Sequence, residues 1–238
     1  MRLGVVSRLW RYPVKSMLGE ACEQLDLDAR GVAGDRRFAI RDPAGKLGSG
    51  KTTRRFRQID GLFEFRAADR GEVPEIVFPD GRRMLGNDPD IHAALSAALG
   101  QPVTLARETD VSHLDVGAVH LLTTASLAWL GRTLPDAAVD ERRFRPNVVL
   151  DVAGDGPVER EWLGRSLRIG PDAVLRISKP TARCRMVTLA QSELPDDARI
   201  LREIARDPDV GFGVYADVVV AGRIRLGDSV TVSGSGGS

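Results

Sequence analysis

Short runs of alternating apolar and polar residues dominate the hydrophobic pattern of this chain. Residues 22–28, CEQLDLD, alternate with the period of two that predicts a β-strand. Comparable runs occupy residues 5–14, 37–42, 62–67, 74–84 and 102–108 in the first half, and residues 147–151, 167–170, 173–180, 183–190, 212–220, 223–227 and 229–234 in the second. Asp80-Gly81 marks a hairpin turn. The pattern predicts a mainly β protein.

Three segments have a helical pattern instead, at residues 87–99, 123–131 and 196–206. The first starts at an Asn87 or Asp88 cap and ends at Gly100. The second starts at a Thr123 or Thr124 cap. Many short strands with few helices predict an α+β, mainly β, fold built on β-barrels.

A polar link at residues 108–117 divides the pattern into two parts. We expect an N-terminal β-barrel-like domain over residues 1–108 and a second β-barrel domain over residues 109–232. Residues 233–238, SGSGGS, have the composition of a flexible tail.

Composition narrows the class of protein. The chain has 238 residues, 42% of them hydrophobic, which is enough for a sizeable core. Its 34 basic and 33 acidic residues are interspersed, which argues against a nucleic-acid partner. It shows neither an apolar run of about 18 residues nor a secretion signal, so we expect a cytoplasmic protein without a membrane partner. Two cysteines, Cys22 and Cys184, indicate reduced thiols and exclude a cluster held by four cysteines.

Residues 45–52, GKLGSGKT, have the spelling of a phosphate-binding P-loop. A working P-loop needs a buried strand before the glycines and a helix that starts at the Lys-Thr pair. Upstream, Asp42-Pro43-Ala44-Gly45 is typical of a turn between antiparallel strands, and downstream the apolar residues give a poor helical stripe. We therefore interpret the segment as a glycine-rich hairpin loop between two strands and keep a P-loop nucleotide-binding protein as a remote alternative.

The candidate for metal or covalent chemistry is Cys184, which stands between Arg183 and Arg185. Flanking guanidinium groups favour the thiolate, the form that binds metals or attacks electrophiles. The alternative is an inert core cysteine, which is also our interpretation of Cys22.

Two further segments carry groups suited to an anionic ligand. Lys15-Ser16 brings a cation and a hydroxyl into a loop, and Arg145-Pro146-Asn147 pairs a guanidinium for a phosphate with an amide for a heterocycle. The alternatives are a solvated lysine after a strand end for the first segment and a plain surface turn for the second, since both would have the same sequences.

The three histidines, His92, His113 and His120, are spaced too irregularly for a zinc site. We interpret them as structural or surface residues.

Six motifs occur in an order and spacing similar to those of one family. They are WRYPVKSM at residues 10–17, GVAGDRRFAI at 31–40, LLTTASLAWL at 121–130, FRPNVVLD at 144–151, KPTARCRMVTL at 179–189 and FGVYADVVVAGRIRLGDSV at 212–230. Together they resemble MOSC-domain proteins with an N-terminal MOSC β-barrel domain, a group that includes the mitochondrial amidoxime-reducing component and bacterial relatives. The resemblance runs from about residue 3 to 232.

This resemblance implies a MOSC-type β-barrel core and a molybdenum cofactor, Mo-molybdopterin, held in a cleft between the two domains. It implies that Cys184 is the catalytic residue that binds the metal. Around the molybdopterin and its phosphate it places Lys15, Ser16, Arg36, Thr123, Arg145, Asn147, Ala182 and Tyr215. Cations for a phosphate and a soft thiolate for a metal agree with that assignment.

Two departures from the family pattern concern the surroundings of this site. A frequent Asp-Pro-x-Thr-Gly turn after the cysteine is replaced by residues 190–208, which leaves the substrate side undefined. A segment often read as Thr-Ala-Arg-Gln is SGKTTRRF here, so Lys51 stands near the expected cofactor entrance.

The resemblance implies a molybdenum-cofactor-dependent oxidoreductase that reduces small N-hydroxylated compounds by N–O bond cleavage. Electrons would come from a separate donor protein of ferredoxin, flavoprotein or cytochrome type. The alternative is a carrier or transfer protein for molybdenum cofactor or sulfur, with Cys184 as the sulfur acceptor.

Overall fold

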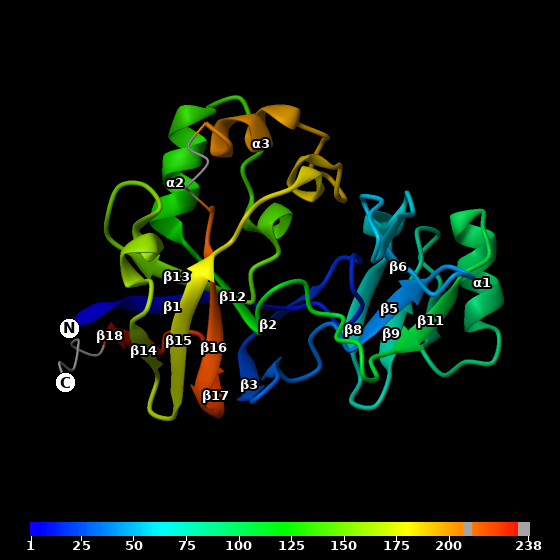
Figure 1. The fold of residues 1–238 in the computed structure, drawn as a ribbon, viewed down its shortest axis with the longest axis horizontal. Coiled ribbons are helices and arrows are strands. Elements are labelled where there is room, and N and C mark those ends of the chain that lie inside the picture. Colours follow the sequence, from blue (N-terminus) through cyan, green and yellow to red (C-terminus); the bar gives the residue numbers. More distant parts are fainter. Residues whose placement is uncertain (207–210, 233–238) are drawn as a thin grey trace.

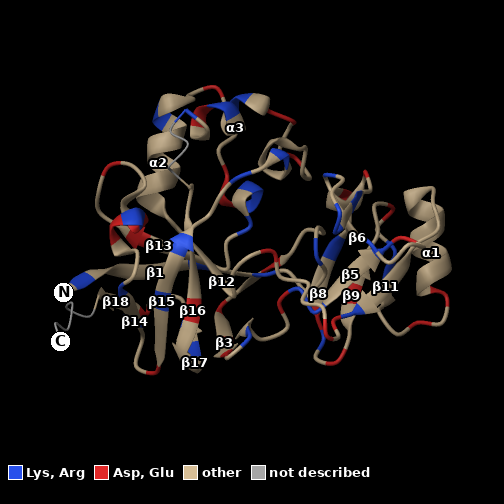
Figure 2. Cartoon of the chain, in the orientation of Figure 1, with Lys and Arg blue, Asp and Glu red and all other residues tan. Residues whose placement is uncertain are grey.

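The computed structural model describes residues 1–206 and 211–232 (Figure 1). The predicted tail at residues 233–238 lies outside the described residues. Two lobes lie side by side, one with helices α2 (Thr124–Thr133) and α3 (Ala198–Ile204), the other with helix α1 (Ile91–Leu99). Basic and acidic residues are spread over both lobes (Figure 2).

The lobe with α2 and α3 is built on a closed barrel. Its seven strands, in the order in which they pair, are β13 (Val148–Val152), β12 (Val119–Thr123), β16 (Val214–Val220), β15 (Ala173–Pro180), β14 (Ser166–Ile169), β18 (Ser229–Val232) and β1 (Arg2–Arg11). Strand β1 also pairs with β13, which closes the barrel, and β2 (Glu20–Cys22) extends the sheet from β1. Closure leaves no free edge between the first and last strands.

The other lobe is barrel-like and made of shorter strands. A four-stranded sheet has the order β11 (Thr104–Arg107), β5 (Phe38–Arg41), β6 (Leu47–Ser49), β7 (Phe56–Gln58). A three-stranded sheet has the order β10 (Arg83–Leu85), β9 (Pro74–Val77), β8 (Arg66–Asp69). A third sheet, of β17 (Gly222–Arg225), β3 (Gln24–Asp28) and β4 (Gly31–Val32), belongs instead to the closed barrel, because Leu25, Leu27 and Ile224 are part of that barrel's core. The predicted mainly β fold with two barrel-like parts is confirmed.

Each lobe has its own apolar core. In the closed barrel, Val6 and Leu9 of β1 are buried with inward-facing side chains of the other strands, such as Leu121 and Leu175. In the second lobe the core lies between α1 and the two sheets. Since β1 belongs to the core of the closed barrel, the chain visits that barrel at both of its ends. The division at residues 108 and 109 stays a prediction.

The predicted helices and turns are largely present. Gly100 ends α1 in the left-handed conformation with φ 66°, and the Thr123 side chain caps α2. Helix α1 begins at Ile91 rather than near Asn87, because Asp88 accepts a hydrogen bond from the Asp90 amide at 2.9 Å and forms a turn there.

The predicted strand at residues 183–190 is wrong. Residues Arg185–Thr188 form the 3₁₀ helix η4 instead, with the Val187 amide 3.1 Å from the Cys184 carbonyl and the Thr188 hydroxyl 2.8 Å from the Arg185 carbonyl. Alternation of apolar residues is equally compatible with a short 3₁₀ turn that buries Val187 and Thr188. The remaining 3₁₀ helices are η1 (Leu62–Glu64), η2 (Glu141–Phe144) and η3 (Val158–Trp162).

The P-loop spelling has a different structural use. Gly45 turns the chain between antiparallel strands β5 and β6 at φ 79°, as the sequence predicts. The prediction that residues 45–52 form a hairpin loop is wrong for the rest of the segment, because Leu47–Ser49 form strand β6, which then pairs with β7 in parallel. Residues Lys51–Arg55 lead into β7 and form no helix. The helix N-terminus that a P-loop requires is not formed at Lys51.

None of the helices in residues 1–206 and 211–232 has the length and apolar character needed to cross a membrane.

Gly4 tests the importance of barrel closure. A Cβ atom at this position would lie 1.9 Å from the Asp151 carbonyl oxygen on β13. We expect Gly4→Ala to push β1 away from β13 and lower the free energy of unfolding by more than about 2 kcal/mol. Urea denaturation measures this change. Gly131→Ala is the control, since no atom lies within 4 Å of a Cβ there, and in α2 it should gain up to about 1 kcal/mol.

Candidate functional site

A cavity of about 430 Å³ opens between the two lobes. Its walls come from the loop after β1, the segment between β6 and β7, the 114–117 link, the loop before β13 and the segment after β15. Eight of the nine residues proposed from the sequence line it: Lys15, Ser16, Arg36, Arg145, Asn147, Ala182, Cys184 and Tyr215. Residues more than 160 positions apart in the chain therefore meet at one place.

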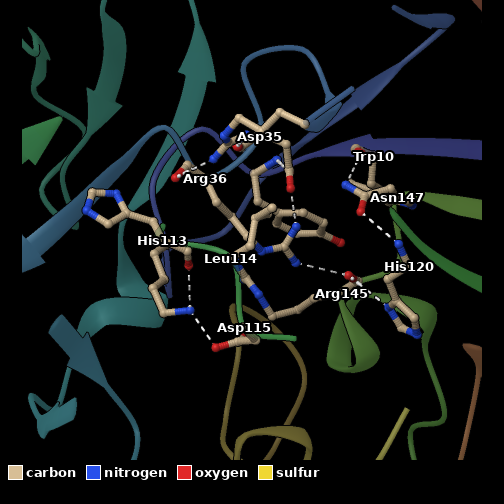
Figure 3. A network of polar contacts seen from close by, with 12 residues as sticks. Trp10, Asp35, Arg36, His113, Leu114, Asp115, His120, Arg145 and Asn147 are labelled. Atoms are coloured by element: carbon tan, nitrogen blue, oxygen red, sulfur yellow. Dashed lines mark hydrogen bonds and ion pairs between the residues drawn. The ribbon is translucent and has the colours of Figure 1, made fainter. Parts of the chain in front are cut away.

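Two buried guanidinium groups lie at the inner end of this set (Figure 3). Arg36 forms an ion pair with the fully buried Asp35, whose other oxygen accepts the Tyr12 amide at 2.8 Å. Arg145 donates through Nη1 to the Met17 carbonyl at 2.6 Å, and its guanidinium carbon lies 4.2 Å from the centre of the Tyr12 ring. We call Arg36 and Arg145 the inner pair. Among the described residues, one carboxylate, that of Asp35, forms an ion pair with the inner pair, which carries two positive charges.

The inner pair is electrostatically costly without a further anion. Burial and the neighbouring Arg36 lower the pKa of Arg145 to about 10. The Nη2 atom of Arg145 is buried without a hydrogen-bond partner among the described residues. Both arginines also have positive φ angles, 50° for Arg36 and 55° for Arg145, as does Ser16 in the same cavity at 65°. Strained backbone of this kind gathers at functional sites.

Lys15 is nearly fully buried beside the inner pair. Its Nζ atom donates to the His113 carbonyl at 3.0 Å and to Asp115 Oδ1 at 2.6 Å. Burial lowers the pKa of Lys15 to about 8, although Asp115 opposes the shift. Two of the three ammonium protons are used, which leaves one for a ligand.

The half-buried Cys184 faces the cavity next to Arg183. It precedes η4 in an extended conformation with φ −133°. Arg183 is held by the Phe212 carbonyl at 2.7 Å and the Phe144 carbonyl at 3.0 Å, and burial lowers its pKa to about 10. The guanidinium of Arg183, which has no carboxylate partner in the part of the chain that the structure describes, thus stands beside the thiol, as the sequence suggests.

His120 connects the two cationic regions. Its Nε2 atom lies 2.6 Å from Arg183 Nη2, and its Nδ1 atom lies 3.2 Å from the Arg145 carbonyl oxygen. Because the guanidinium can only donate, Nε2 accepts and Nδ1 carries the proton. Burial holds the pKa of His120 well below its usual range, so the ring is neutral. His120 fixes Arg183 relative to Arg145.

Asn147 lines the cavity but is largely committed to the fold. Its Oδ1 atom accepts the His120 amide at 3.1 Å, and its Nδ2 atom donates to the Trp10 carbonyl at 3.3 Å. One amide N–H is left for a ligand. Ser16 likewise donates to the Gly48 carbonyl at 3.0 Å, which leaves its oxygen as an acceptor only.

The ninth proposed residue, Thr123, does not line the cavity. Its hydroxyl donates to the buried Glu159 at 2.7 Å and caps α2 through the Ser126 amide at 3.1 Å. Glu159 also accepts from the Ser126 hydroxyl and from the Gly213 amide at 3.1 Å. Gly213 adjoins His120 and Arg183, since a Cβ there would meet both. Thr123 supports the cavity wall from behind.

Sequence analysis missed several lining residues. His120 was interpreted as structural or surface, and Asp115 and Arg55 carried no signal. The basic lining residues are Lys15, Arg36, Lys51, Arg55, Arg143, Arg145 and Arg183. Asp115 is the single acid in the described part of the lining. This imbalance makes the cavity a site for an anion.

The lining also fits a hydrogen-bonding anionic group in detail. Three buried polar atoms in it, Arg55 Nε, Arg145 Nη2 and Thr181 Oγ1, have no partner among the described residues. Across the described ranges no group of three His, Cys, Asp or Glu side chains is placed to hold a metal ion. A metal bound at Cys184 would therefore take its remaining ligands from a cofactor.

Comparison with protein families gives two matches in the order that the sequence motifs suggest. The MOSC domain family matches residues 108–231, and the MOSC N-terminal beta barrel domain family matches residues 3–69. The chain belongs to the MOSC-domain family. MOSC domains are in general associated with binding of the molybdenum cofactor.

One solved structure adds support for the fold of this MOSC protein. The YUAD protein from Bacillus subtilis is 14% identical, and the alignment covers 98% of this chain and 96% of that one with a TM-score of 0.55. YiiM from Geobacillus stearothermophilus is 19% identical over 50% of this chain and 56% of its own, with a TM-score of 0.39. Among curated proteins the chain has no match.

Lys15 predicts a pH dependence of anion binding. A bound anion favours the protonated amine, so affinity should fall as pH rises through about 8, the pKa of Lys15. We expect the affinity for sulfate, which does not titrate in this range, to decrease between pH 7 and pH 9. Isothermal titration calorimetry at a fixed ionic strength measures it. Lys15→Met should remove the dependence, whereas Lys179→Met, an exposed lysine outside the cavity, should keep it.

Thr123 predicts a separation of stability from ligand binding. We expect Thr123→Ala to lower the free energy of unfolding by about 1–3 kcal/mol, because it removes the α2 cap and a bond to buried Glu159. Thr123→Ser keeps the hydroxyl and should stay within about 1 kcal/mol of the parent protein. Urea denaturation compares the three proteins. Equal losses for Ala and Ser would contradict the assigned role of the hydroxyl.

Proposed function

We propose that this MOSC protein is a molybdenum-cofactor-dependent oxidoreductase that reduces small N-hydroxylated compounds by cleavage of the N–O bond. The observation that carries the proposal is the position of Cys184. Its thiol faces a cavity with a large excess of basic side chains and with three buried polar atoms that lack a partner among the described residues. A single thiolate beside an anion site is what a metal attached to a phosphorylated organic cofactor requires.

The chain offers separate groups for the two ends of such a cofactor. Lys15 and the inner pair, Arg36 and Arg145, would hold the phosphate, and Cys184 would bind the metal. The bound cofactor supplies two-electron redox chemistry at molybdenum. Asn147 and Thr181 have hydrogen-bonding capacity left for a heterocycle.

Protons for the cleaved oxygen can come from side chains of the lining. Burial raises the pKa of Tyr215, so its hydroxyl keeps its proton at neutral pH, and Lys15 is mostly protonated below its pKa of about 8. The neutral His120 ring holds the charged guanidinium of Arg183 in place next to the thiol. Preorganised donors of this kind stabilise charge that develops during bond cleavage.

We assign the electrons to a separate donor protein of ferredoxin, flavoprotein or cytochrome type. The two cysteines of the chain are too few for a four-cysteine cluster, and Cys22 lies on β2 away from the cavity.

A carrier of molybdenum cofactor or sulfur is the second candidate function. The half-buried Cys184 is accessible enough to hold a persulfide, and the neighbouring Arg183 favours its anionic form. The two functions differ in turnover, since a carrier would reduce no N-hydroxylated compound in any form.

Cys184→Ser tests both functions. Protein from cells grown with molybdate should contain close to one molybdenum per chain and reduce an amidoxime with a chemical electron donor. We expect Cys184→Ser to lose at least about 100-fold in kcat/KM and most of the metal, because an alcohol is a poor ligand for a soft site. Metal analysis and the electron paramagnetic resonance spectrum of partly reduced protein measure the second effect.

Cys22→Ser is the matched control, because Cys22 is half-buried, and burial raises its pKa to about 11. It should keep both metal and turnover. If the parent protein shows no turnover and Cys184→Ser loses sulfur transfer, the carrier function is supported and the oxidoreductase function is contradicted.

A further inference from the structure

Three cationic side chains gather around the ring of Phe56 at the cavity wall. The Nζ atom of Lys15 lies 5.1 Å from the ring centre, the guanidinium carbon of Arg55 lies 5.3 Å away and the Nζ atom of Lys51 lies 5.4 Å away. All four residues line the cavity. We call Lys15, Lys51 and Arg55 the outer cluster.

The charge of the outer cluster is poorly compensated. Asp115, on Lys15, is its one carboxylate partner among the described residues. Arg55 donates to the backbone carbonyls of Ser112 and Leu114, and its buried Nε atom has no partner. Lys51 forms no hydrogen bond or ion pair with the side chains that the structure describes. One aromatic face offsets only part of the repulsion among three cations.

The outer cluster is distinct from the inner pair. Arg36 and Arg145 are organised around Tyr12 and Asp35, whereas Lys51 and Arg55 come from the segment between β6 and β7. Lys15 stands between them, because both Arg36 and Arg55 are close enough to act on its charge. A single phosphate at the inner pair would leave Lys51 and Arg55 without an anion.

The glycine-rich segment explains how Lys51 reaches this position. The Gly50 amide lies 3.0 Å from Met186 Sδ on η4, and a Cβ at Gly50 would come within 2.5 Å of that sulfur. Glycine therefore allows the segment to approach η4 closely and directs Lys51 into the cavity. Thr52 accepts the Gln58 amide at 3.1 Å, so its hydroxyl shapes the loop.

From this geometry we propose that the outer cluster is a second anion subsite that binds a phosphate group beyond the one expected at the inner pair. Two sources have the required chemistry: a nucleotide attached to the phosphate of the cofactor, or a phosphate on the substrate. The subsite itself rests on Lys51 and Arg55, and only the choice between its sources rests on the proposed function.

The test compares the affinity of the parent protein and of two double variants for inorganic triphosphate. Each protein is used as purified, with any cofactor that it retains. We expect the double variant Lys51→Gln/Arg55→Gln to lose at least about tenfold in affinity by calorimetry, since two charge-assisted contacts are removed. Arg54→Gln/Arg57→Gln is the matched control, because these exposed arginines flank the same segment outside the cavity. It should change affinity less than about twofold. Equal affinities for the two double variants would overturn the subsite, provided that both melt at the parent temperature.

Two further measurements identify the source. Acid release of a nucleoside monophosphate, equimolar with molybdenum in the parent protein and reduced in the Lys51→Gln/Arg55→Gln variant, supports the cofactor. A KM increase of at least about tenfold in that variant, restricted to a ring-phosphorylated benzamidoxime and absent for benzamidoxime itself, supports the substrate. Protein without molybdenum would end the proposed function, while the triphosphate comparison would still decide the subsite.

Discussion

The contact between Arg145 and the loop after β1 holds the site together. Arg145 belongs to the loop before β13, yet its guanidinium donates to the Met17 carbonyl and lies against Tyr12. His120 and Arg36 both bond to its backbone carbonyl, at 3.2 and 3.4 Å. One residue thereby fixes the loop after β1, the neutral imidazole and the second guanidinium. Moving it would disturb the loop after β1, Arg36 and His120 together.

This arrangement concentrates positive charge where solvent is scarce. A buried charge is expensive unless it is paired, and among the described residues the inner pair forms an ion pair with Asp35 alone. Arg183 likewise has no carboxylate partner among the described residues, and it is held by two backbone carbonyl groups and by His120. Proteins tolerate such groups mainly where a ligand completes the pairing. The electrostatics of the cavity thus point to an anionic ligand independently of family membership.

Sequence patterns predicted the fold better than they predicted the geometry of the site. Period-two runs and hairpin signals were sufficient for a mainly β, two-barrel architecture, because they reflect local chemistry. The prediction of a strand after Cys184 was wrong, since alternation over a few residues does not distinguish a strand from the 3₁₀ helix η4. His120 could not be assigned, because its role depends on Arg183 and Arg145, which only the closed barrel brings to it. Thr123 was correctly seen as a helix cap, yet the hydroxyl faces Glu159 and not the cavity.

The positive φ angles of Ser16, Arg36 and Arg145 place two demands on the same three positions. Each strained conformation destabilises the fold by about 1–3 kcal/mol, and glycine at that position would remove the strain. It would also delete a hydroxyl or a charge from the cavity wall. Variants selected only for heat resistance should therefore accumulate glycine at these positions. Such variants should fold well but bind anions more weakly. At these three positions, the residue that gives the more stable fold is therefore not the residue that binds an anion.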